Sequence, residues 1–409
     1  MQVPIFAELP PPPSDKTGWP WTEGSPKLTD HMPNGNRWPL VSIVTPSYNQ
    51  GQFIEETIRS VLLQGYPNLE YIIIDGGSTD NSVEIIRKYE PWLHYWISEP
   101  DNGQSEAINK GFQLSNGEVI AWINSDDFYM PGVIHEVICS LIINCNQGLI
   151  YGDVDIINEN GKHHGKFTGC QTNAKKLLLE RNSIPQPAAF IRQSDMNKTG
   201  GLDKNLDYVM DYDLWIRLAL VSPLCYIPSN LAVFRLHENS KSTSQSIPML
   251  IELEILLNSR KYAKEILSES EITEVFRRLE IRKSLEYFLL DNKEYFLISL
   301  NKSLYEKGWP FGSVNLLTEI IYSYSGICGY KMDQSLIWKY LELIKTDKHN
   351  RKKQHLYKKL LVKYHTSELW HNRHNKTKSE IRNHLLQAIS NDYTLLRNRG
   401  ILSIAIRSI

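Results

Sequence analysis

Hydrophobic positions follow two different periods in the first part of this chain. Between residues 41 and 124, short apolar runs rich in Val and Ile alternate with longer segments in which apolar residues recur every three or four positions. The short runs are typical of buried strands and lie at residues 41–45, 69–75, 93–97 and 118–124. The longer segments predict helices at residues 53–62, 80–90 and 104–114. This alternation predicts an α/β fold with a mostly parallel, Rossmann-like sheet that has helices on both faces.

The pattern changes twice further along the chain. After residue 140 the alternation loosens, with strand candidates at 148–158 and 187–193 and a helix at 211–221. The segment from Leu224 predicts a pair of strands that leads into a polar turn. From about residue 247 onward only amphipathic helical patterns occur, which predicts an all-helical C-terminal region.

Three parts are therefore expected. An extended Pro- and Trp-rich arm precedes the first strand and packs on the next part through Trp19, Trp21 and Trp38. The α/β domain follows, with an N-terminal and a C-terminal half, and then the helical region with a basic tail. The expected boundaries are 1–38 for the arm, 39–140 and 141–245 for the two halves of the domain, and 246–409 for the helical region.

Composition limits the class of protein. The 409 residues are 41% apolar and 22% charged, which is typical of a globular chain with more than one domain. Neither a membrane-spanning run nor a signal-peptide pattern is present, and the five cysteines show no C-x-x-C pair. These features predict a cytoplasmic protein with reduced cysteines.

Charge is distributed unevenly although the net charge is −1. Residues 351–409 contain 13 Lys and Arg but only three acids, Glu368, Glu380 and Asp392. This basic region could contact an anionic membrane surface, it could be a solvated helical face, or the apolar stretch 401–408 could form an oligomer contact. No nucleic-acid-binding motif accompanies it, so no nucleic-acid partner is expected.

Polar residues follow four of the predicted strands. Because the carboxyl ends of parallel strands meet at one rim of a sheet, where ligands bind, these clusters should lie together. They are Thr45–Asn49, Asp75, Glu99–Asp101 and Asn124–Asp127.

The last cluster carries adjacent carboxylates, Asp126 and Asp127, at the end of an apolar run. Acids placed beside a core cost desolvation energy unless a cation or hydrogen bonds compensate. Oxygen ligands of this kind suit Mg²⁺ or Mn²⁺. An alternative is that the two acids cap a following helix near Pro131.

Several motifs occur in an order that resembles glycosyltransferase family 2, the inverting, nucleotide-sugar-dependent enzymes with the GT-A fold. They are TPSYNQGQF, IIIDGGSTDNS, SEPDNGQSEAINKG, GEVIAWINSDD and MDYDLWIRLA, and the resemblance runs from about Val41 to Ser242. Two positions depart from the family pattern. Asn124 stands at the first carboxylate of the D-x-D type motif, and Met210 stands where the family has Glu.

The resemblance implies that residues 39–140 are the nucleotide-binding half of the domain and residues 141–245 the acceptor half. It also implies roles for individual residues. Asp211 falls on the catalytic base, which takes the proton from the acceptor hydroxyl. Metal contact falls on Asp126, Asp127 and His237. Nucleotide-sugar binding falls on Thr45, Pro46, Tyr48, Asn49, Asp75, Asp101, Gln104, Asn124, Ser125 and Asp126. Weaker candidates for the acceptor or the phosphates are Gln186, Asp213 and Arg235.

Several of these residues could instead have a purely structural role. Asp75 could be a turn residue before two glycines, and Asp101 or Asn102 could be an ordinary helix N-cap. Asp211 and Asp213 could be acids of a first helical turn, and His237 could be a buried structural histidine.

The resemblance implies an inverting hexosyl- or N-acetylhexosaminyltransferase that uses a UDP-linked donor and a divalent cation, Mn²⁺ or Mg²⁺. The acceptor would be a glycan or a lipid-linked molecule in polysaccharide biosynthesis. No G-x-S-x-G or Cys/His signature suggests a covalent nucleophile. A nucleotidyltransferase of the same fold would need a basic residue after the first strand, where TPSYNQGQF has none. Because of Asn124 and Met210, a catalytically inactive nucleotide-sugar or glycan-binding module remains the alternative.

Overall fold

The structure is a computed structural model that describes residues 4–143, 147–180, 182–237, 240, 246–305, 338–342, 351–371, 377–393 and 395. It forms two compact units, described separately below. The first contains residues 1–243 and 255–266, and the second contains residues 244–254 and 267–409. The segment 255–266 thus belongs to the first unit, although the expected boundary at residue 245 placed it with the C-terminal helices.

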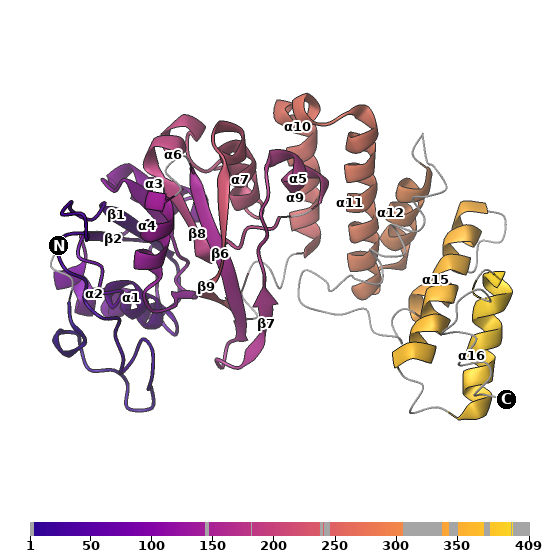
Figure 1. Cartoon of the computed structure of the whole chain (residues 1–409), viewed down its shortest axis with the longest axis horizontal. Coiled ribbons are helices and arrows are strands. Elements are labelled where there is room, and N and C mark those ends of the chain that lie inside the picture. The colour runs from indigo at the N-terminus through magenta and orange to yellow at the C-terminus, as the bar shows by residue number, and fades with distance from the viewer. Residues whose placement is uncertain are drawn as a thin grey trace. The chain divides into compact units, whose positions relative to one another are not determined.

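A nine-stranded mixed sheet forms the centre of the first unit (Figure 1), in the order β3-β2-β1-β4-β8-β6-β9-β5, with β7 paired to β6. Its strands are β1 Val41–Ser47, β2 Leu69–Asp75, β3 Tyr95–Ser98, β4 Val119–Trp122, β5 Phe128–Tyr129, β6 Leu149–Asn158, β7 His163–Phe167, β8 Ala189–Arg192 and β9 Leu224–Leu236. The expected parallel pairing is correct for β3-β2-β1-β4 and also for the pair β6–β9. Beyond β4, the pairs β4–β8, β6–β8, β5–β9 and β6–β7 are antiparallel.

Helices cover both faces of the parallel part, as predicted. They are α1 Ile54–Leu62, α2 Ser82–Tyr89, α3 Gln104–Leu114, α4 Val133–Ile143, α5 Ala174–Leu179, α6 Gln193–Thr199 and α7 Met210–Val221, with 3-10 turns at Phe6–Glu8, Glu90–Trp92 and Gln186–Ala188. Alternate residues of β1 show the two layers. Ile43 packs in one core with Ile58 of α1 and Ile134 of α4. Val44 faces α3, where a Cβ on Gly111 would lie 2.3 Å from its side chain, so the helix can approach the strand closely only at a glycine.

The predicted pair of strands after residue 224 is wrong, because β9 is one strand of 13 residues. Its register against β6 shifts between Tyr151 and Val154, opposite the Pro-Ser-Asn segment that resembled a turn. Pro228 is exposed there, and a Cβ on Gly152 would lie 2.6 Å from the Ser229 carbonyl oxygen. The strand therefore continues through an irregularity that a glycine accommodates.

The N-terminal arm packs on the sheet domain through its tryptophans, as predicted. Trp21 and Trp38 are buried, and Trp19 donates a 2.7 Å hydrogen bond to the Tyr129 carbonyl. Arg59 of α1 is completely buried, and three carbonyl groups of the arm accept its guanidinium protons at 2.9–3.0 Å, namely those of Pro10, Pro20 and Trp21. The arm thus supplies the acceptors that a buried cation requires.

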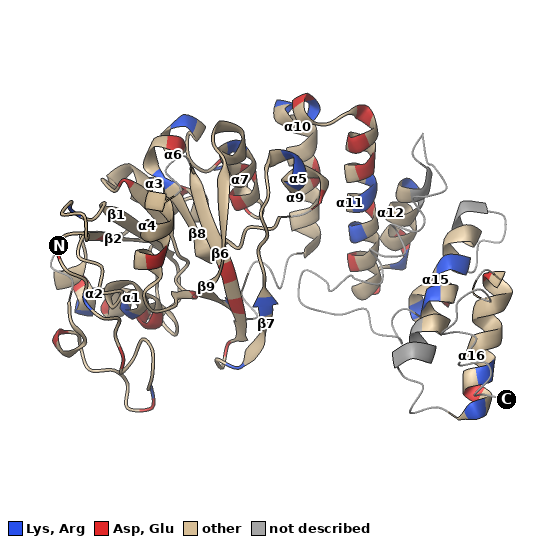
Figure 2. Cartoon of the chain, viewed as in Figure 1, with Lys and Arg blue, Asp and Glu red and all other residues tan. Residues whose placement is uncertain are grey.

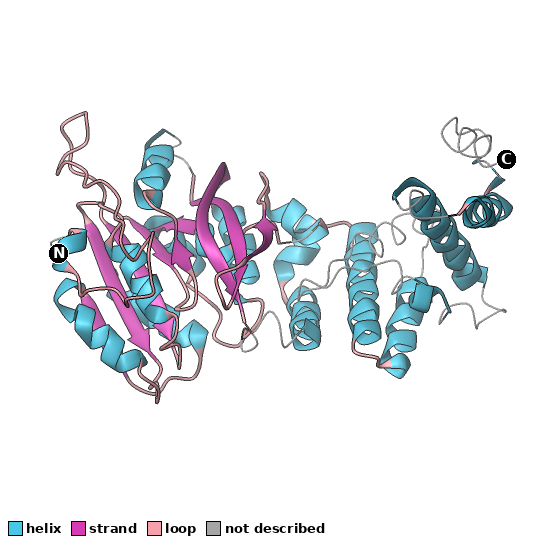
Figure 3. Cartoon of the chain, turned by 90° about the horizontal axis from the view of Figure 1, so that it is seen from below, coloured by secondary structure: helices cyan, strands magenta, loops and turns pink. Residues whose placement is uncertain are grey.

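The second unit is helical in its described residues, as predicted, and the named strands, magenta in Figure 3, belong to the first unit. The helices of the second unit, among the residues described, include α11 Glu269–Leu289, α12 Lys293–Tyr305, α15 Arg351–His371 and α16 Lys378–Asn391. The helix α9 Ser246–Ser259 is divided between the two units after Glu254, and α10 Lys261–Ile266 belongs to the first unit. Leu285, Phe296, Tyr340 and Leu360 belong to one apolar core. Within the described part of the chain, each helix is too short or too polar to cross a membrane.

Candidate active site

The loop after β1 is shorter than the sequence motif suggested. β1 continues to Ser47, so Thr45 and Pro46 are buried within the strand, and the Thr45 hydroxyl lies 3.0 Å from the Tyr71 hydroxyl. The expectation that these two residues line a nucleotide pocket is therefore not met. Tyr48 is 62% exposed, and Asn49 adopts a φ of 52°.

Asn49 and the turn after β2 are joined by hydrogen bonds. The Asn49 N–H donates to the Ser78 hydroxyl at 2.8 Å, and the Thr79 N–H donates to Asn49 Oδ1 at 2.8 Å. Asp75 ends β2, is fully buried, and accepts from the Ser78 N–H, the Ser78 hydroxyl and the Ser98 hydroxyl at 2.6–2.9 Å. Asp75 therefore shapes this turn, as the plain turn reading expected, and its contact with a nucleotide base stays a prediction.

Asp101 lies beside this turn, because a Cβ on Gly76 would come within 2.8 Å of Asp101 Oδ2. Gly103, with a φ of 119°, occupies the N-cap position of α3, and no side chain caps the helix among the described residues. The reading of Asp101 or Asn102 as an ordinary N-cap is therefore wrong. The start of α3 presents backbone N–H groups next to an exposed acid, Asp101, and the partly exposed Gln104.

Asn124 lies at the centre of a side-chain amide network. Its Oδ1 accepts from Gln104 Nε2 at 2.8 Å, and its Nδ2 donates to Asp127 Oδ2 at 3.3 Å and to Gln186 Oε1 at 3.1 Å. Gln186 in turn donates to the Trp122 carbonyl at 2.8 Å. Asn124 thus joins the end of β4, the start of α3 and the 3-10 turn at Gln186, while the adjacent Ser125 is buried.

Asp126 and His237 form a close pair although they are 111 positions apart in the chain. His237 Nε2 lies 2.9 Å from Asp126 Oδ2, and Phe53 packs against the imidazole with ring centroids 5.1 Å apart. Neighbouring ligand atoms of an octahedral Mg²⁺ or Mn²⁺ at about 2.1 Å would be about 3 Å apart. One carboxylate and one imidazole at this spacing fit a cation whose other ligands come from substrate phosphates and water.

Asp127 does not join this pair. Its carboxylate is fully buried and accepts from the Arg235 N–H at 2.9 Å. Burial, and secondarily the Asp126 carboxylate, raises the pKa of Asp127 well above its usual value. The described part of the chain contains no group of three His, Cys, Asp or Glu side chains arranged for a metal ion, so the expected three-residue set of Asp126, Asp127 and His237 is not assembled. The helix-cap alternative also fails for Asp127, because α4 begins only at Val133.

Arg235 contacts the loop formed by residues Asn124–Asp127, which is called the acidic loop below. Its side chain is 4% exposed, its Nε donates to the Asp126 carbonyl at 3.0 Å, and its Nη2 donates to Glu56 at 2.7 Å. Glu56 also accepts from Trp21 Nε1 of the arm at 3.3 Å. This guanidinium is directed to protein groups, so the structure favours a positioning role for Arg235 over the expected phosphate contact.

Asp211 lies in the first turn of α7 and is partly exposed. Burial of its carboxylate raises its pKa from 3.8 to about 6, although hydrogen bonds from the Tyr212 N–H at 2.7 Å and from Asn182 Nδ2 at 3.4 Å oppose the rise. A carboxylate with this pKa is ionised at neutral pH and is a stronger base than an ordinary aspartate.

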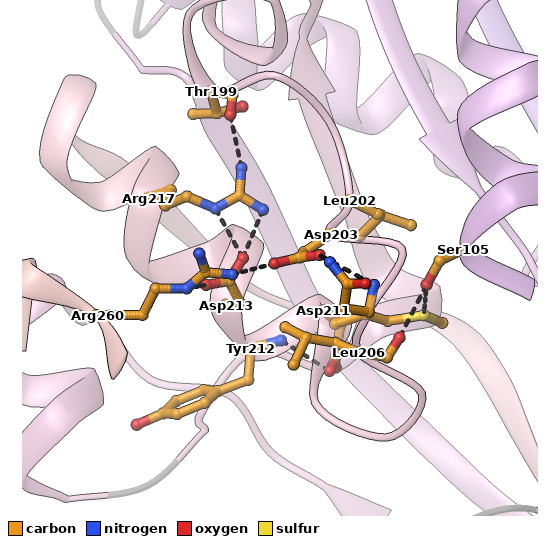
Figure 4. Close-up of polar contacts among 12 residues, drawn as sticks. Ser105, Thr199, Leu202, Asp203, Leu206, Asp211, Tyr212, Asp213, Arg217 and Arg260 are labelled. Atoms are coloured by element: carbon orange, nitrogen blue, oxygen red, sulfur yellow. Dashed lines mark hydrogen bonds and ion pairs between the residues drawn. The ribbon is translucent and has the colours of Figure 1, made fainter. Parts of the chain in front are cut away.

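Asp213 has a different environment from Asp211, as expected for acids two positions apart on a helix. It is completely buried and accepts from Arg217 Nε at 2.7 Å and from the Tyr262 hydroxyl at 3.0 Å. Figure 4 shows Asp213 turned toward Arg217 and Arg260, away from Asp211. Its role is therefore structural, and the expected contact with an acceptor is not supported.

Two separate segments connect Asn124 to the region of Asp211. In the first, Asn182 contacts Asp211 and Gln186, four residues later, contacts Asn124. In the second, Gln104 contacts Asn124 and the adjacent Ser105 donates to the Leu206 carbonyl at 3.1 Å, in the loop before α7. Contacts through two segments therefore link Asn124 of the acidic loop to the region of the raised-pKa carboxylate. Sequence analysis missed Ser105 and Asn182, for which no motif signalled a role.

Comparison with known proteins identifies the family of the chain. The family model described as "Glycosyl transferase family 2" matches residues 42–198. A protein of Mycobacterium tuberculosis named as an uncharacterized glycosyltransferase is 31% identical over 186 residues, which cover 45% of this chain and 70% of the relative. The chain belongs to glycosyl transferase family 2. The family match reaches the acidic loop but ends before Asp211 and His237.

Other family 2 relatives are longer than the matched region. A glycosyltransferase of Rickettsia felis is 30% identical over 213 residues, and the match spans 50% of this chain but only 35% of that relative. The crystal structure of S. aureus TarS 1–349 in complex with UDP is 14% identical with a TM-score of 0.46, and the match covers 81% of this chain and 93% of that one. A likeness at this level carries no argument about donor or acceptor.

Proposed function

We propose that this family 2 chain transfers a sugar from a UDP-linked donor to a hydroxyl group of a glycan or lipid-linked acceptor, with inversion and with Asp211 as general base. The observation that carries the proposal is the position of Asp211. A carboxylate with a pKa of about 6 borders the same site as the acidic loop, through Asn182 and Gln186 on one side and α3 on the other. Ionised at neutral pH and partly exposed, this carboxylate suits proton abstraction from an alcohol.

The donor half of the site supports binding of a diphosphate. The N-cap residue of α3, Gly103, has no side chain that could accept from the first-turn N–H groups, and the helix dipole favours an anion there. Two carboxylates already accept from the residues just before the helix: Asp101 from the Gly103 N–H and Glu106 from the Asn102 N–H, both at 2.9 Å. Asp126 and His237 would hold Mn²⁺ or Mg²⁺ next to that anion. When bound, such a cation neutralises charge on the departing diphosphate.

The chain's own residues then account for the reaction. Asp211 accepts the proton of the acceptor hydroxyl, and that oxygen forms a bond to the anomeric carbon on the face opposite the phosphate. The bond between the anomeric carbon and the phosphate oxygen breaks, so the configuration inverts without a covalent enzyme intermediate. Asn182 and the Tyr212 N–H hold the carboxylate in place during the transfer.

A second candidate function is an inactive nucleotide-sugar-binding module. Asn124 supports this alternative, because it replaces an acid of the family pattern and its amide oxygen is already bonded to Gln104. In that case the donor would bind without transfer.

Mass spectrometry of a panel of nucleotide sugars incubated with the protein and Mn²⁺ tests the proposal. Wild type should release the nucleoside diphosphate from at least one donor, and Asp211→Asn should lose roughly 10²–10⁴-fold in rate. Asp30→Asn is the matched control, because Asp30 is an exposed residue of the arm. Retained nucleotide binding without turnover by the wild type would favour the binding module, and full activity of Asp211→Asn would exclude Asp211 as the base.

The helical unit supports a lipid-linked acceptor. Figure 2 shows basic residues along α15, among them Lys358, which is exposed, and Lys359 and Lys363, which are partly exposed. Each basic residue near an anionic membrane contributes about 1 kcal/mol of binding free energy. The stretch 401–408, expected as an alternative oligomer contact, lies outside the described residues. Sedimentation with vesicles should show binding to anionic but not to neutral lipid, and equal binding to both would contradict the membrane contact.

A further inference from the structure

Two arginine side chains lie beside the buried carboxylate of Asp213, although one would neutralise its charge. Arg217, one turn later on α7, places both Nε and Nη2 at 2.7 Å from Asp213 Oδ2. This arrangement already compensates a buried carboxylate with a charge-assisted, two-point contact. A second guanidinium nevertheless lies beside it, because Arg260 Nε is 3.2 Å from Asp213 Oδ1.

Arg260 also bonds a second acid. Its Nη2 donates to Asp203, which lies in the loop that precedes α7 (Figure 4). One planar guanidinium thus joins the loop to the first turn of α7, through a hydrogen bond to Asp203 and an ion pair, without a hydrogen bond, with Asp213. A rigid guanidinium fixes two acids relative to each other better than a flexible ammonium could. Asp211 lies between Asp203 and Asp213 in the chain.

The loop from 200 to 209 also contacts α3. Asn109 exchanges two hydrogen bonds with the backbone of Leu202, at 2.8 and 2.9 Å, and Ser105 donates to the Leu206 carbonyl at 3.1 Å. α3 also carries Gln104, which contacts Asn124 at the donor side. The loop is therefore held between the donor-side helix and Arg260.

We infer that Arg260 is a positioning residue that sets the place of Asp211 by joining Asp203 to Asp213. This inference rests on the proposed function and deepens it. It assigns a role in the reaction to the segment 255–266, which follows the sheet domain in sequence, lies beyond the family match at residues 42–198, and packs with the first unit.

The test compares variants that break different parts of this arrangement. Arg260→Met and Asp203→Asn each remove the connection between the loop and α7, and we expect each to lower kcat by roughly 10–100-fold while the KM for the donor changes little. Arg260→Lys, which can still contact one or both acids, should restore part of the loss. Tyr262→Phe is the matched control, because it removes a hydrogen bond to the same Asp213 without touching the loop.

If Arg260 served only to compensate the charge of Asp213, Tyr262→Phe and Arg260→Met would each lower stability and kcat in parallel. Arg260→Lys would then recover stability and kcat to the same extent. That result would overturn the inference.

Hydrogen exchange gives a readout that does not need turnover. Amides of residues 203–212 should exchange about 10-fold faster in Arg260→Met than in wild type, with β1 unchanged. Unchanged exchange would overturn the inference even in an active enzyme, whereas faster exchange in a protein that turns over no donor would count against the proposed function alone.

Discussion

Asp211→Asn should make the protein more stable at neutral pH while it removes the base. The carboxylate of Asp211 has a pKa of about 6 in the folded protein against 3.8 for an ordinary aspartate. Such a difference corresponds to about 3 kcal/mol of unfavourable free energy for holding the charged form in the fold. Asparagine has nearly the same shape and carries no charge, so it avoids this cost.

The gain in stability is reduced by a lost hydrogen bond, and it depends on pH through proton linkage. Asparagine can lose the weak 3.4 Å hydrogen bond from Asn182, so the net gain should be about 2 kcal/mol at pH 7. Because the folded pKa is raised, the folded state binds the proton more tightly than the unfolded state. Wild-type stability should therefore fall as pH rises from about 4 to about 6, and the advantage of Asp211→Asn should disappear below about pH 4.

Thermal unfolding followed by tryptophan fluorescence measures this effect, because Trp122 and Trp215 are buried and stacked in the first unit. For a domain of this size, about 2 kcal/mol corresponds to a rise in Tm of roughly 4–8 °C. Wild type, Asp211→Asn and Asp30→Asn should be compared at several pH values from about 4.5 to 8. A variant no more stable than wild type at high pH, or equally more stable at every pH, would refute the reasoning that burial raises the pKa of Asp211.

Three further changes test other parts of the site. His237→Ala should weaken Mn²⁺ binding by roughly 10-fold, measured by electron paramagnetic resonance of the ion, and unchanged affinity would exclude His237 as a ligand. Asn124→Asp should lower the melting temperature without metal, because a second carboxylate would lie next to Asp127, and added Mn²⁺ should recover the loss; insensitivity to Mn²⁺ would contradict a cation site here. Trp21→Phe should cost about 1 kcal/mol of unfolding free energy by removing the hydrogen bond to Glu56, and no change in chemical denaturation would show that this bond is not formed.

Local sequence pattern predicted the parallel part of the sheet well, because strands buried on both faces have continuous apolar runs. β2 and α3 have the predicted bounds, Leu69–Asp75 and Gln104–Leu114. β7 was missed because its sequence, His163–Phe167, is polar and mostly exposed, without an apolar alternation. The irregular β9 was read as two strands because a Pro-Ser-Asn segment has the composition of a turn.

The site could be predicted only as far as topology determines it. Parallel strands end at one rim, which correctly brought Asn49, Asp75 and Asp101 near one another. The partner of each side chain depends on contacts between distant segments. The family resemblance placed Asp126 and His237 at one metal site, and their side chains are in contact. Local spacing alone predicts neither this pairing nor the hydrogen bond from Asn182 to Asp211.

The buried Arg59 has a practical consequence for protein engineering. A truncated protein that begins at the first strand of the sheet would retain the guanidinium but lose the carbonyls of Pro10, Pro20 and Trp21, leaving only the Tyr89 hydroxyl at 3.1 Å. If the guanidinium stayed buried, losing these partners would cost several kcal/mol, a large fraction of the stability of a typical domain. If it became exposed instead, the surface that the arm covers would be opened to water, because Phe6 and Trp21 of the arm also pack against this guanidinium. Expression fragments and fusion junctions for this transferase should therefore begin before Pro10.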